Sequence, residues 1–252
     1  MLKIRVIPTM LHRDLGLVKG VNFDSWRRVG SAMQTVRVYN LRQVDELILL
    51  DISATKDNHP IDIELVDQIA DECFAPLTVG GGIRAIGDVR DLLMAGADKV
   101  AVCTAAVENP ALINQIAENF GSQCVVVALD ARLRVDGTYE VHTHSGTKAT
   151  GLDAVEFARN AERLGAGEIL VTSIDRDGTM LGYDIELCRL VSSAVDIPVI
   201  ASGGAGTAAH MAEVLRETRV AAVAAASAFH FTELTPLEAK RHLADEGFAV
   251  RL

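Results

Sequence analysis

The chain has 252 residues, of which 49% are hydrophobic and 23% are charged, a composition typical of a globular protein with a large core. Its formal charge of -10 argues against a nucleic-acid partner, because a phosphate backbone needs a basic face. No apolar run approaches the ~18 residues of a membrane span, and the four cysteines form no CxxC pair, so we expect a cytoplasmic protein with no membrane partner and no zinc site.

Short runs rich in Val, Ile and Leu alternate with amphipathic stretches along the whole chain. Continuous apolar runs of this length are typical of parallel strands that are buried on both faces. They predict eight strands, at residues 3–11, 46–52, 76–81, 99–105, 124–130, 168–175, 198–204 and 220–227. Helical patterns lie between them, among others at residues 62–74, 85–96, 110–121, 151–165 and 184–195. The α/β pattern predicts one (β/α)8 TIM barrel domain over residues 1–252.

The two halves of the chain resemble each other. PLTVGGGIR from Pro76 aligns with PVIASGGAG from Pro198, and ELILL from Glu46 aligns with EILVT from Glu168, in both cases 122 residues apart. This repeat predicts two similar half-barrels. The first strand, ending at Leu11, then corresponds to the fifth, ending at Asp130, at an offset of 119. A functional group is expected at both strand ends, yet a carboxylate stands at only one.

Glycine clusters follow the third and seventh predicted strands. Glycine lets backbone N–H groups approach an anion, and the loops after the last strands of a barrel commonly bind phosphate. A single cluster could simply turn the chain, but two at symmetric positions favour phosphate, and so predict a substrate with a phosphate at each end. The candidate residues in the two clusters are Gly81, Gly82, Gly203 and Gly204. The segment AASAF after the eighth strand adds Ala225 and Ser227.

Several aspartates follow predicted strands, where barrel enzymes carry their catalytic groups. Such a carboxylate can act as a general acid or base, or it can cap the next helix. Capping is the favoured interpretation for Asp51 and Asp175. Asp130, at the end of the fifth strand, is the candidate catalytic group.

Four charged residues lie near the starts of predicted strands: Arg5, Glu46, Lys99 and Glu168. Strand alternation puts Arg5 on the same face as Leu11, so Arg5 points into the barrel if Leu11 does. We therefore expect two acids and two bases to converge on the barrel floor. Their spacing alone does not separate a salt-bridged plug from a functional cluster.

Two connecting segments carry further polar residues. The long loop after the first strand contains Lys19, a weak candidate for a substrate contact. A hairpin with an Asp-Gly turn is expected at residues 134–146, with His142, His144 and Ser145 near the barrel mouth. Lone histidines in an exposed hairpin are more often solvated than catalytic. No histidine has metal-ligand spacing, so neither a metal nor a cofactor is expected.

Segments spread over nearly the whole chain resemble the cyclase-subunit family of imidazole glycerol phosphate synthase. VKGVNF and DRDGT distinguish this family from the sister isomerase of histidine biosynthesis. The other matching segments are DELILLDI, PLTVGGGIR, GADKV, NPALI, FGSQCVVVALDA, THSG, TGLDAVE, GAGEIL, GYD, PVIASGGAG and FHF.

The resemblance implies a lyase-type synthase subunit of a glutamine amidotransferase, working with a separate glutaminase subunit in a heterodimer. The glutaminase would dock on the N-terminal barrel face and release ammonia into the barrel axis through a gate formed by Arg5, Glu46, Lys99 and Glu168. The family's substrate is a bis-phosphorylated ribulosyl aminoimidazole carboxamide, converted to imidazole glycerol phosphate and an aminoimidazole carboxamide ribotide. Substrate contacts are expected at Lys19, Thr104, Ser145, Asp177 and Gly178, beside the two phosphate loops.

The chain departs from the family pattern at the substrate-facing strand ends. Leu11 replaces the Asp that pairs with the family's equivalent of Asp130, Cys103 replaces an Asn, and Leu15-Gly16 replaces Gly-Arg. A Leu cannot transfer a proton, and losing one member of such a pair costs at least ~10²-fold in rate. The expected function is therefore a paralogue that adds ammonia to another acceptor, such as an acetamido sugar. The alternatives are a genuine histidine-pathway cyclase and a non-catalytic ammonia conduit.

Overall fold

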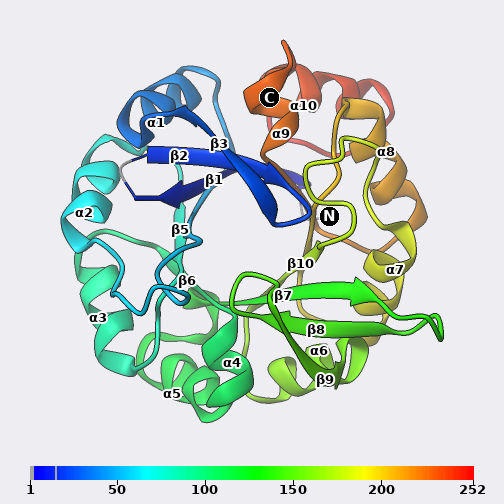
Figure 1. The fold of residues 1–252 in the computed structure, drawn as a ribbon. Helices are drawn as coiled ribbons and strands as arrows, with labels where there is room; N and C mark the ends of the chain where they lie inside the picture. Colours follow the sequence, from blue (N-terminus) through cyan, green and yellow to red (C-terminus); the bar gives the residue numbers. More distant parts are fainter. Residues whose placement is uncertain (1–2, 15) are drawn as a thin grey trace.

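Eight parallel strands close into a barrel, as the sequence predicts. The computed structural model describes residues 3–14 and 16–252, and its barrel is seen end-on in Figure 1. Each strand pairs with the next in parallel, and the last pairs back onto the first, with Arg5 opposite Ala222. The strands are β1 (Arg5–Arg13), β4 (Leu47–Asp51), β5 (Leu77–Gly80), β6 (Lys99–Val102), β7 (Val125–Leu133), β10 (Glu168–Ser173), β11 (Val199–Ser202) and β12 (Ala222–Ala225).

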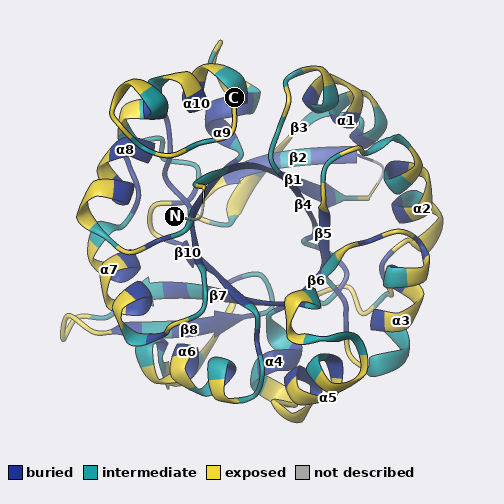
Figure 2. Cartoon of the chain, turned by 180° about the vertical axis from the view of Figure 1, so that it is seen from behind, coloured by how far each residue is buried: buried dark blue, intermediate teal, exposed yellow. Residues whose placement is uncertain are grey.

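An outer ring of helices covers the barrel, with buried inner faces and exposed outer faces (Figure 2). Aspartates cap several of them; for example, Asp62 and Asp184 each accept a hydrogen bond from a backbone N–H of the first turn. The ring consists of α1 (Ala32–Leu41), α2 (Ile63–Glu72), α3 (Ile86–Met94), α5 (Ala111–Phe120), α6 (Ala154–Arg163), α7 (Ile185–Ala194), α8 (Ala208–Glu217) and α10 (Pro236–Asp245). None of the described helices combines the length and the apolar character needed to cross a membrane.

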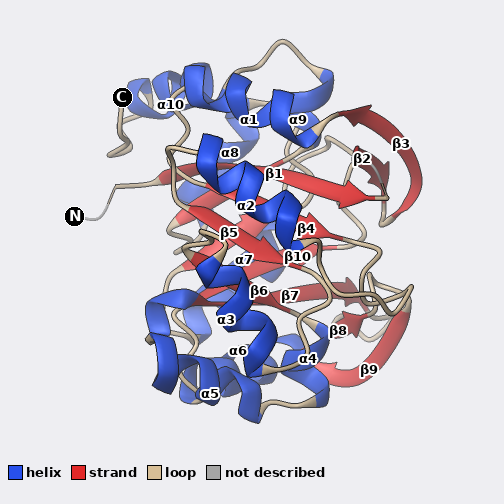
Figure 3. Cartoon of the chain, turned by 90° about the vertical axis from the view of Figure 1, so that its left-hand side faces the viewer, coloured by secondary structure: helices blue, strands red, loops and turns tan. Residues whose placement is uncertain are grey.

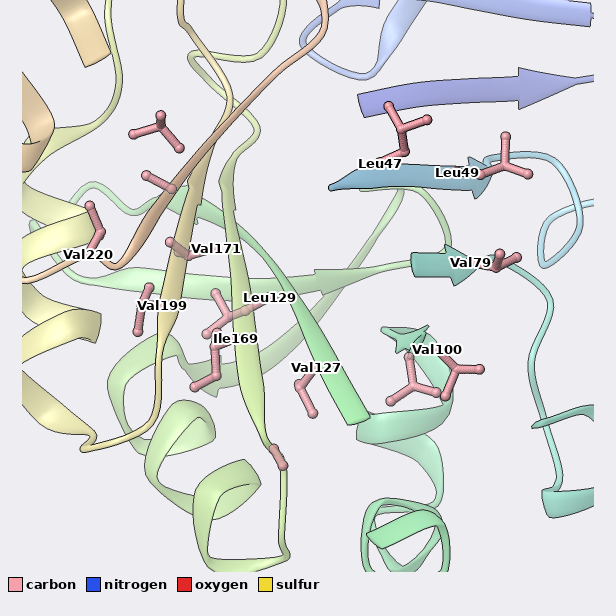
Figure 4. Packing of buried hydrophobic residues seen from close by; sticks show 14 of the residues in the cluster. Leu47, Leu49, Val79, Val100, Val127, Leu129, Ile169, Val171, Val199 and Val220 are labelled. Atoms are coloured by element: carbon pink, nitrogen blue, oxygen red, sulfur yellow. The ribbon is translucent and has the colours of Figure 1, made fainter. Parts of the chain in front are cut away.

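The strands are buried on both faces, which explains their continuous apolar runs. Val127 and Leu129 on β7, with Ile169 and Val171 on β10, pack outward against the helices (Figure 4). The alternate residues point inward and form a second, smaller cluster inside the barrel: Ile7, Ile48, Ala101, Val126, Leu170, Ile200, Ala222 and Ala224. The period-2 alternation of a strand therefore divides one apolar run between two cores.

Each half-barrel adds an antiparallel hairpin to its first strand. The expected hairpin at residues 134–146 is confirmed in part: β8 (Tyr139–Thr143) pairs with β7, and β9 (Lys148–Asp153) then pairs with β8. The prediction of a long loop after the first strand is wrong, because this segment forms the strands β2 (Gly16–Val21) and β3 (Asp24–Gly30). Both hairpins lie at the end of the barrel toward which the parallel strands point (Figure 3). Leu15, one of the departures from the family pattern, lies outside the described residues.

Candidate active site

A single open cavity at the carboxyl ends of the strands brings the predicted substrate-side residues together. Its volume is about 1140 Å³, including solvent at its mouth. The barrel strands, the loops after β5, β6, β11 and β12, and both hairpins contribute to its wall. The predicted residues that line it are Lys19, Gly81, Gly82, Thr104, Asp130, Ser145, Asp177, Gly178, Gly203, Gly204, Ala225 and Ser227.

Asp130 is a half-buried carboxyl group in this wall, and its pKa is displaced upward. Burial raises the pKa of Asp130 to about 7, and the negative charge of Asp177 adds to the effect. Hydrogen bonds from the Cys103 thiol, with Sγ 3.5 Å from Asp130 Oδ2, and from Thr172 partly oppose the shift. Near neutral pH this carboxyl group is therefore divided between its acid and base forms, which is the state a proton-transfer group needs.

The first strand presents no carboxylate to the cavity. Leu11 lines the wall, and Thr9 lies two residues below it on the same face of β1. Asp14, the next acid along the chain, is exposed and lies 3.7 Å from Arg13, away from the cavity wall. Asp130 thus faces a cavity in which the position equivalent to its own, Leu11 on β1, carries a hydrocarbon side chain.

The two glycine loops occupy equivalent positions around the mouth. Gly81 follows β5 and Gly203 follows β11, and both have positive φ angles, at 105° and 86°. Next to each loop a short helix begins, α4 (Thr104–Glu108) beside the first and α9 (Ser227–Phe231) beside the second. The Ser227 hydroxyl is buried and has no hydrogen-bond partner among the described residues. An unpaired buried hydroxyl in a glycine-rich wall is suited to an anionic ligand.

We expect Gly81→Ala to destabilise the protein by about 1–3 kcal/mol, because its φ angle strains an L side chain. An added Cβ would also stand 2.1 Å from the carbonyl oxygen of Asp51. Gly87→Ala is the matched control: it lies in α3 with nothing within 4 Å, and should stabilise by about 0.5–1 kcal/mol. Urea unfolding of both variants measures the difference, and equal effects would rule out the strain.

Lys19 is a fixed residue of the cavity wall, which corrects its expected place in a loop. It lies on β2 with 2% of its side chain exposed, and its Nζ donates to both carboxylate oxygens of Asp177, at 2.8 and 2.7 Å. The partner stands 158 residues away in the chain. The ion pair ties the first hairpin to the loop after β10 across the mouth.

Removing one member of a buried ion pair leaves the other charge without compensation. We expect Lys19→Met to lower the free energy of unfolding by about 3 kcal/mol, because Asp177 remains buried. Lys148→Met is the control: its ammonium pairs with Glu108 at the surface and should contribute under about 1 kcal/mol. Denaturant titrations that gave similar small losses for both variants would contradict this.

The predicted capping of the next helix by Asp51 and Asp175 is wrong, because Asp62 and Asp184 cap the helices that follow. Asp51 accepts hydrogen bonds from the backbone N–H groups of Ser53 and Ala54 and from the Ser53 hydroxyl. Burial alone would raise its pKa, but hydrogen bonds, first from His12 and then from Ser53 and Ala54, lower it to about 2. Asp51 also lines the cavity, where its lowered pKa keeps it ionised at neutral pH. Asp175 accepts from Leu133 N and lies outside the cavity wall.

The histidines of the second hairpin differ from each other. His142 was expected to be solvated, but it is buried on β8, and its Nδ1 lies 3.2 Å from the carbonyl oxygen of Gly146. Cross-strand pairing with β7 covers it, which the local pattern did not indicate. His144 is half-exposed, 3.9 Å from Glu108. Within residues 3–14 and 16–252, no three His, Cys, Asp or Glu side chains gather as a metal ion would require.

The four charged residues meet on the barrel floor in an alternating ring. Arg5 Nη1 lies 2.7 Å from Glu46 and 2.8 Å from Glu168, and Lys99 Nζ lies 3.3 Å from Glu46 and 3.0 Å from Glu168. Burial works against the charge of Arg5, but Glu168 and Glu46 outweigh it and raise its pKa. The predicted convergence is confirmed. The ring closes the end of the barrel opposite the cavity.

The cavity wall also contains residues that the sequence pattern does not indicate. Phe23 and Trp26 line the mouth from the first hairpin, where the sequence predicts only a loop. Thr172 hydrogen-bonds to Asp130 and is its partner in the β7–β10 register. The predicted strand order already placed the fifth and sixth strands side by side, so Thr172 could have been found from that adjacency.

Comparison with known proteins agrees with the site. The model of the histidine biosynthesis protein family matches residues 5–235. Two relatives, both named imidazole glycerol phosphate synthase subunit HisF and both from Caulobacter vibrioides, are 52% identical over 253 residues, covering 100% of this chain and 97% of each relative. These names support the histidine-pathway alternative better than the expected paralogue, and neither points to an acetamido sugar. With matches of this extent, the chain belongs to the histidine biosynthesis protein family.

Proposed function

We propose that the chain is the ammonia-using cyclase subunit of an imidazole glycerol phosphate synthase of histidine biosynthesis, a lyase-type enzyme that works with a separate glutaminase subunit. Full-length similarity to two subunits of that name supports the assignment. The observation that carries it is the position of Asp130. Its pKa of about 7 puts a proton-transfer group in one cavity with two glycine loops, while a ring of four charges closes the opposite end of the same barrel.

The substrate is held at both ends. Gly81 and Gly82 with Thr104 form one anion site, and Gly203 and Gly204 with the Ser227 hydroxyl form the other, so that a molecule with two phosphates spans the mouth. Asp130 lies on the wall between the two loops and gives or takes the proton at the reacting centre. The fixed ammonium of Lys19 balances Asp177 at the same wall.

Ammonia enters from the floor in this proposal. Arg5, Glu46, Lys99 and Glu168 form the gate, and the apolar interior above it, which includes Ile7 and Ile48, admits neutral ammonia more readily than ammonium.

The glutaminase docks around the gate. Helices in a (β/α)8 barrel end where the next strand begins, so the exposed side chains of Leu41, Phe74 and Met94, at or just after the ends of α1, α2 and α3, belong to the floor end. Exposed apolar side chains beside the gate suit a protein partner.

The test supplies an ammonium salt and the bis-phosphorylated ribulosyl aminoimidazole carboxamide substrate, and follows imidazole glycerol phosphate. We expect product to form, at a rate at least ~10²-fold below that of a family member with the first-strand aspartate, because Leu11 cannot share the proton transfer. Complete absence of product with a correctly folded protein would overturn the proposal.

A second candidate rests on Leu11 alone. A hydrocarbon side chain in the cavity wall suits a different ammonia acceptor, one whose reaction needs a single acid or base group. Binding of the histidine-pathway substrate separates the two functions. Tight binding with slow turnover favours the cyclase, whereas weak binding and no turnover favour the other acceptor.

A further inference from the structure

A buried lysine on the outer helix ring contacts the segment that leads into β4 at the barrel floor. Lys240, on α10, donates from Nζ to the carbonyl oxygen of Gln43 at 2.6 Å and to Oδ1 of Asp45 at 3.2 Å. The side chains of Lys240 and Asp45 are only 2% and 6% exposed. A lysine is almost never fully buried unless it is paired. Both of its partners lie in the segment that leads into β4.

Asp45 joins the first two strands of the barrel. Its second oxygen, Oδ2, accepts a hydrogen bond from the backbone N–H of Val6 at 2.9 Å. Val6 directly follows Arg5, and Asp45 directly precedes Glu46. The Asp45 carboxylate therefore links the backbone of β1 to the start of β4, directly beside the Arg5–Glu46 ion pair, which is the shortest of the floor ring.

A similar link occurs at another member of the ring. Asp98 directly precedes Lys99, and its Oδ2 accepts from the backbone N–H of Leu77 at 2.8 Å. In both places an aspartate next to a ring residue fixes the start of its strand to the start of a neighbouring strand. At Asp45 the buried ammonium of Lys240 holds the aspartate in addition.

We propose that Lys240 and Asp45 are positioning residues for the ammonia gate, an inference that rests on the proposed function. Lys240 fixes the orientation of Asp45, and Asp45 fixes the register of Arg5 against Glu46. Without the ammonium, the Asp45 carboxylate is buried beside a single N–H donor and turns toward water. The Arg5–Glu46 pair then loses its alignment, and ammonia escapes at the floor before it reaches the cavity.

The test uses Lys240→Met in complex with a glutaminase subunit of an imidazole glycerol phosphate synthase. We expect glutamine-dependent turnover to fall by up to about 10²-fold, the loss that a 1 Å displacement can cause, and free ammonia to accumulate in the medium. Turnover with a saturating ammonium salt should keep its wild-type value, because the cavity is unchanged. Asp45→Asn should show the same separation.

Leu243→Ala is the matched control. Leu243 lies on the same helix, is fully buried in the outer core, and has a hydrocarbon side chain that forms neither an ion pair nor a hydrogen bond. Its loss weakens the packing of α10 and should leave the ratio of glutamine-dependent to ammonium-dependent turnover unchanged. If Lys240→Met behaves like Leu243→Ala, the lysine is only structural and the inference is overturned.

A crystal structure of Lys240→Met decides the matter without turnover. We expect the Arg5 Nη1–Glu46 Oε1 distance, now 2.7 Å, to exceed the ~4 Å limit of an ion pair. An unchanged distance would overturn the inference. If the wild-type protein shows no turnover even with ammonium, the proposed function fails by itself, and the crystal structure still tests the positioning role.

Discussion

Asp130→Asn is expected to lower ammonium-dependent turnover by about 10²–10⁴-fold, the usual contribution of a positioned acid or base. The substitution keeps the shape of the side chain but removes the ionisation that burial moves to about pH 7. The wild-type pH–rate profile should therefore show an ionisation near pH 7 that the variant lacks. A variant with wild-type turnover would exclude Asp130 from the chemistry.

The same variant tests the pKa through stability. The pKa of Asp130 is raised in the folded protein. Between about pH 4 and pH 7, therefore, the carboxyl group is protonated in the folded protein and ionised in the unfolded chain. Wild-type stability should therefore fall as the pH rises through that window, and Asp130→Asn should not share this fall. At pH 8 the variant should be more stable than the wild type, by on the order of 4 kcal/mol, and near pH 4 the two should agree. Urea titrations at both pH values measure the difference.

Leu11→Asp is expected to raise formation of imidazole glycerol phosphate by at least ~10²-fold, because it returns a second proton-transfer group to the wall that faces Asp130. Combining it with Cys103→Asn exchanges the thiol that contacts Asp130 for the amide that the family resemblance implies at this position. The exchange removes apolar burial worth about 1.5–3 kcal/mol, so the folded fraction must be measured together with the rate.

Leu11→Asn is the control for this gain. It has the size and polarity of the aspartate but cannot transfer a proton, so its turnover should remain at the wild-type level. A gain in both variants would mean that Leu11 merely blocks the substrate. No gain in the Leu11→Asp, Cys103→Asn double variant would favour the other acceptor over the histidine-pathway reaction.

The barrel strands could be predicted because each is buried on both faces and therefore has a continuous apolar run. Val126 and Val127 are neighbours in one apolar run, yet one belongs to the interior cluster and the other packs under the helices. The first hairpin could not be predicted from its turn. Asn22 and Phe23 both adopt positive φ angles, at 53° and 62°, without the glycine that usually signals such a turn.

The candidate site was predictable where local chemistry was sufficient. A glycine cluster and an aspartate that directly follows an apolar run carry their own signal, as Gly81 and Asp130 show. Pairing between residues far apart in the chain leaves no such signal in the local sequence. The burial of Lys19 depends on Asp177, 158 residues away, and the raised pKa of Asp130 depends on the closed barrel around it.

The two acids of the floor ring occupy equivalent positions in the two half-barrels, whereas its two bases have no basic counterpart in the second half. Glu46 and Glu168 are equivalent positions, but Cys124 stands where the repeat would place a second Arg5, and Ala221 where it would place a second Lys99. The first half thus brings a net charge of one positive unit to the floor, and the second half brings one negative unit. Two copies of the first half would face each other with like excess charge. Neutrality at the floor therefore favours pairing of unlike halves over pairing of identical ones.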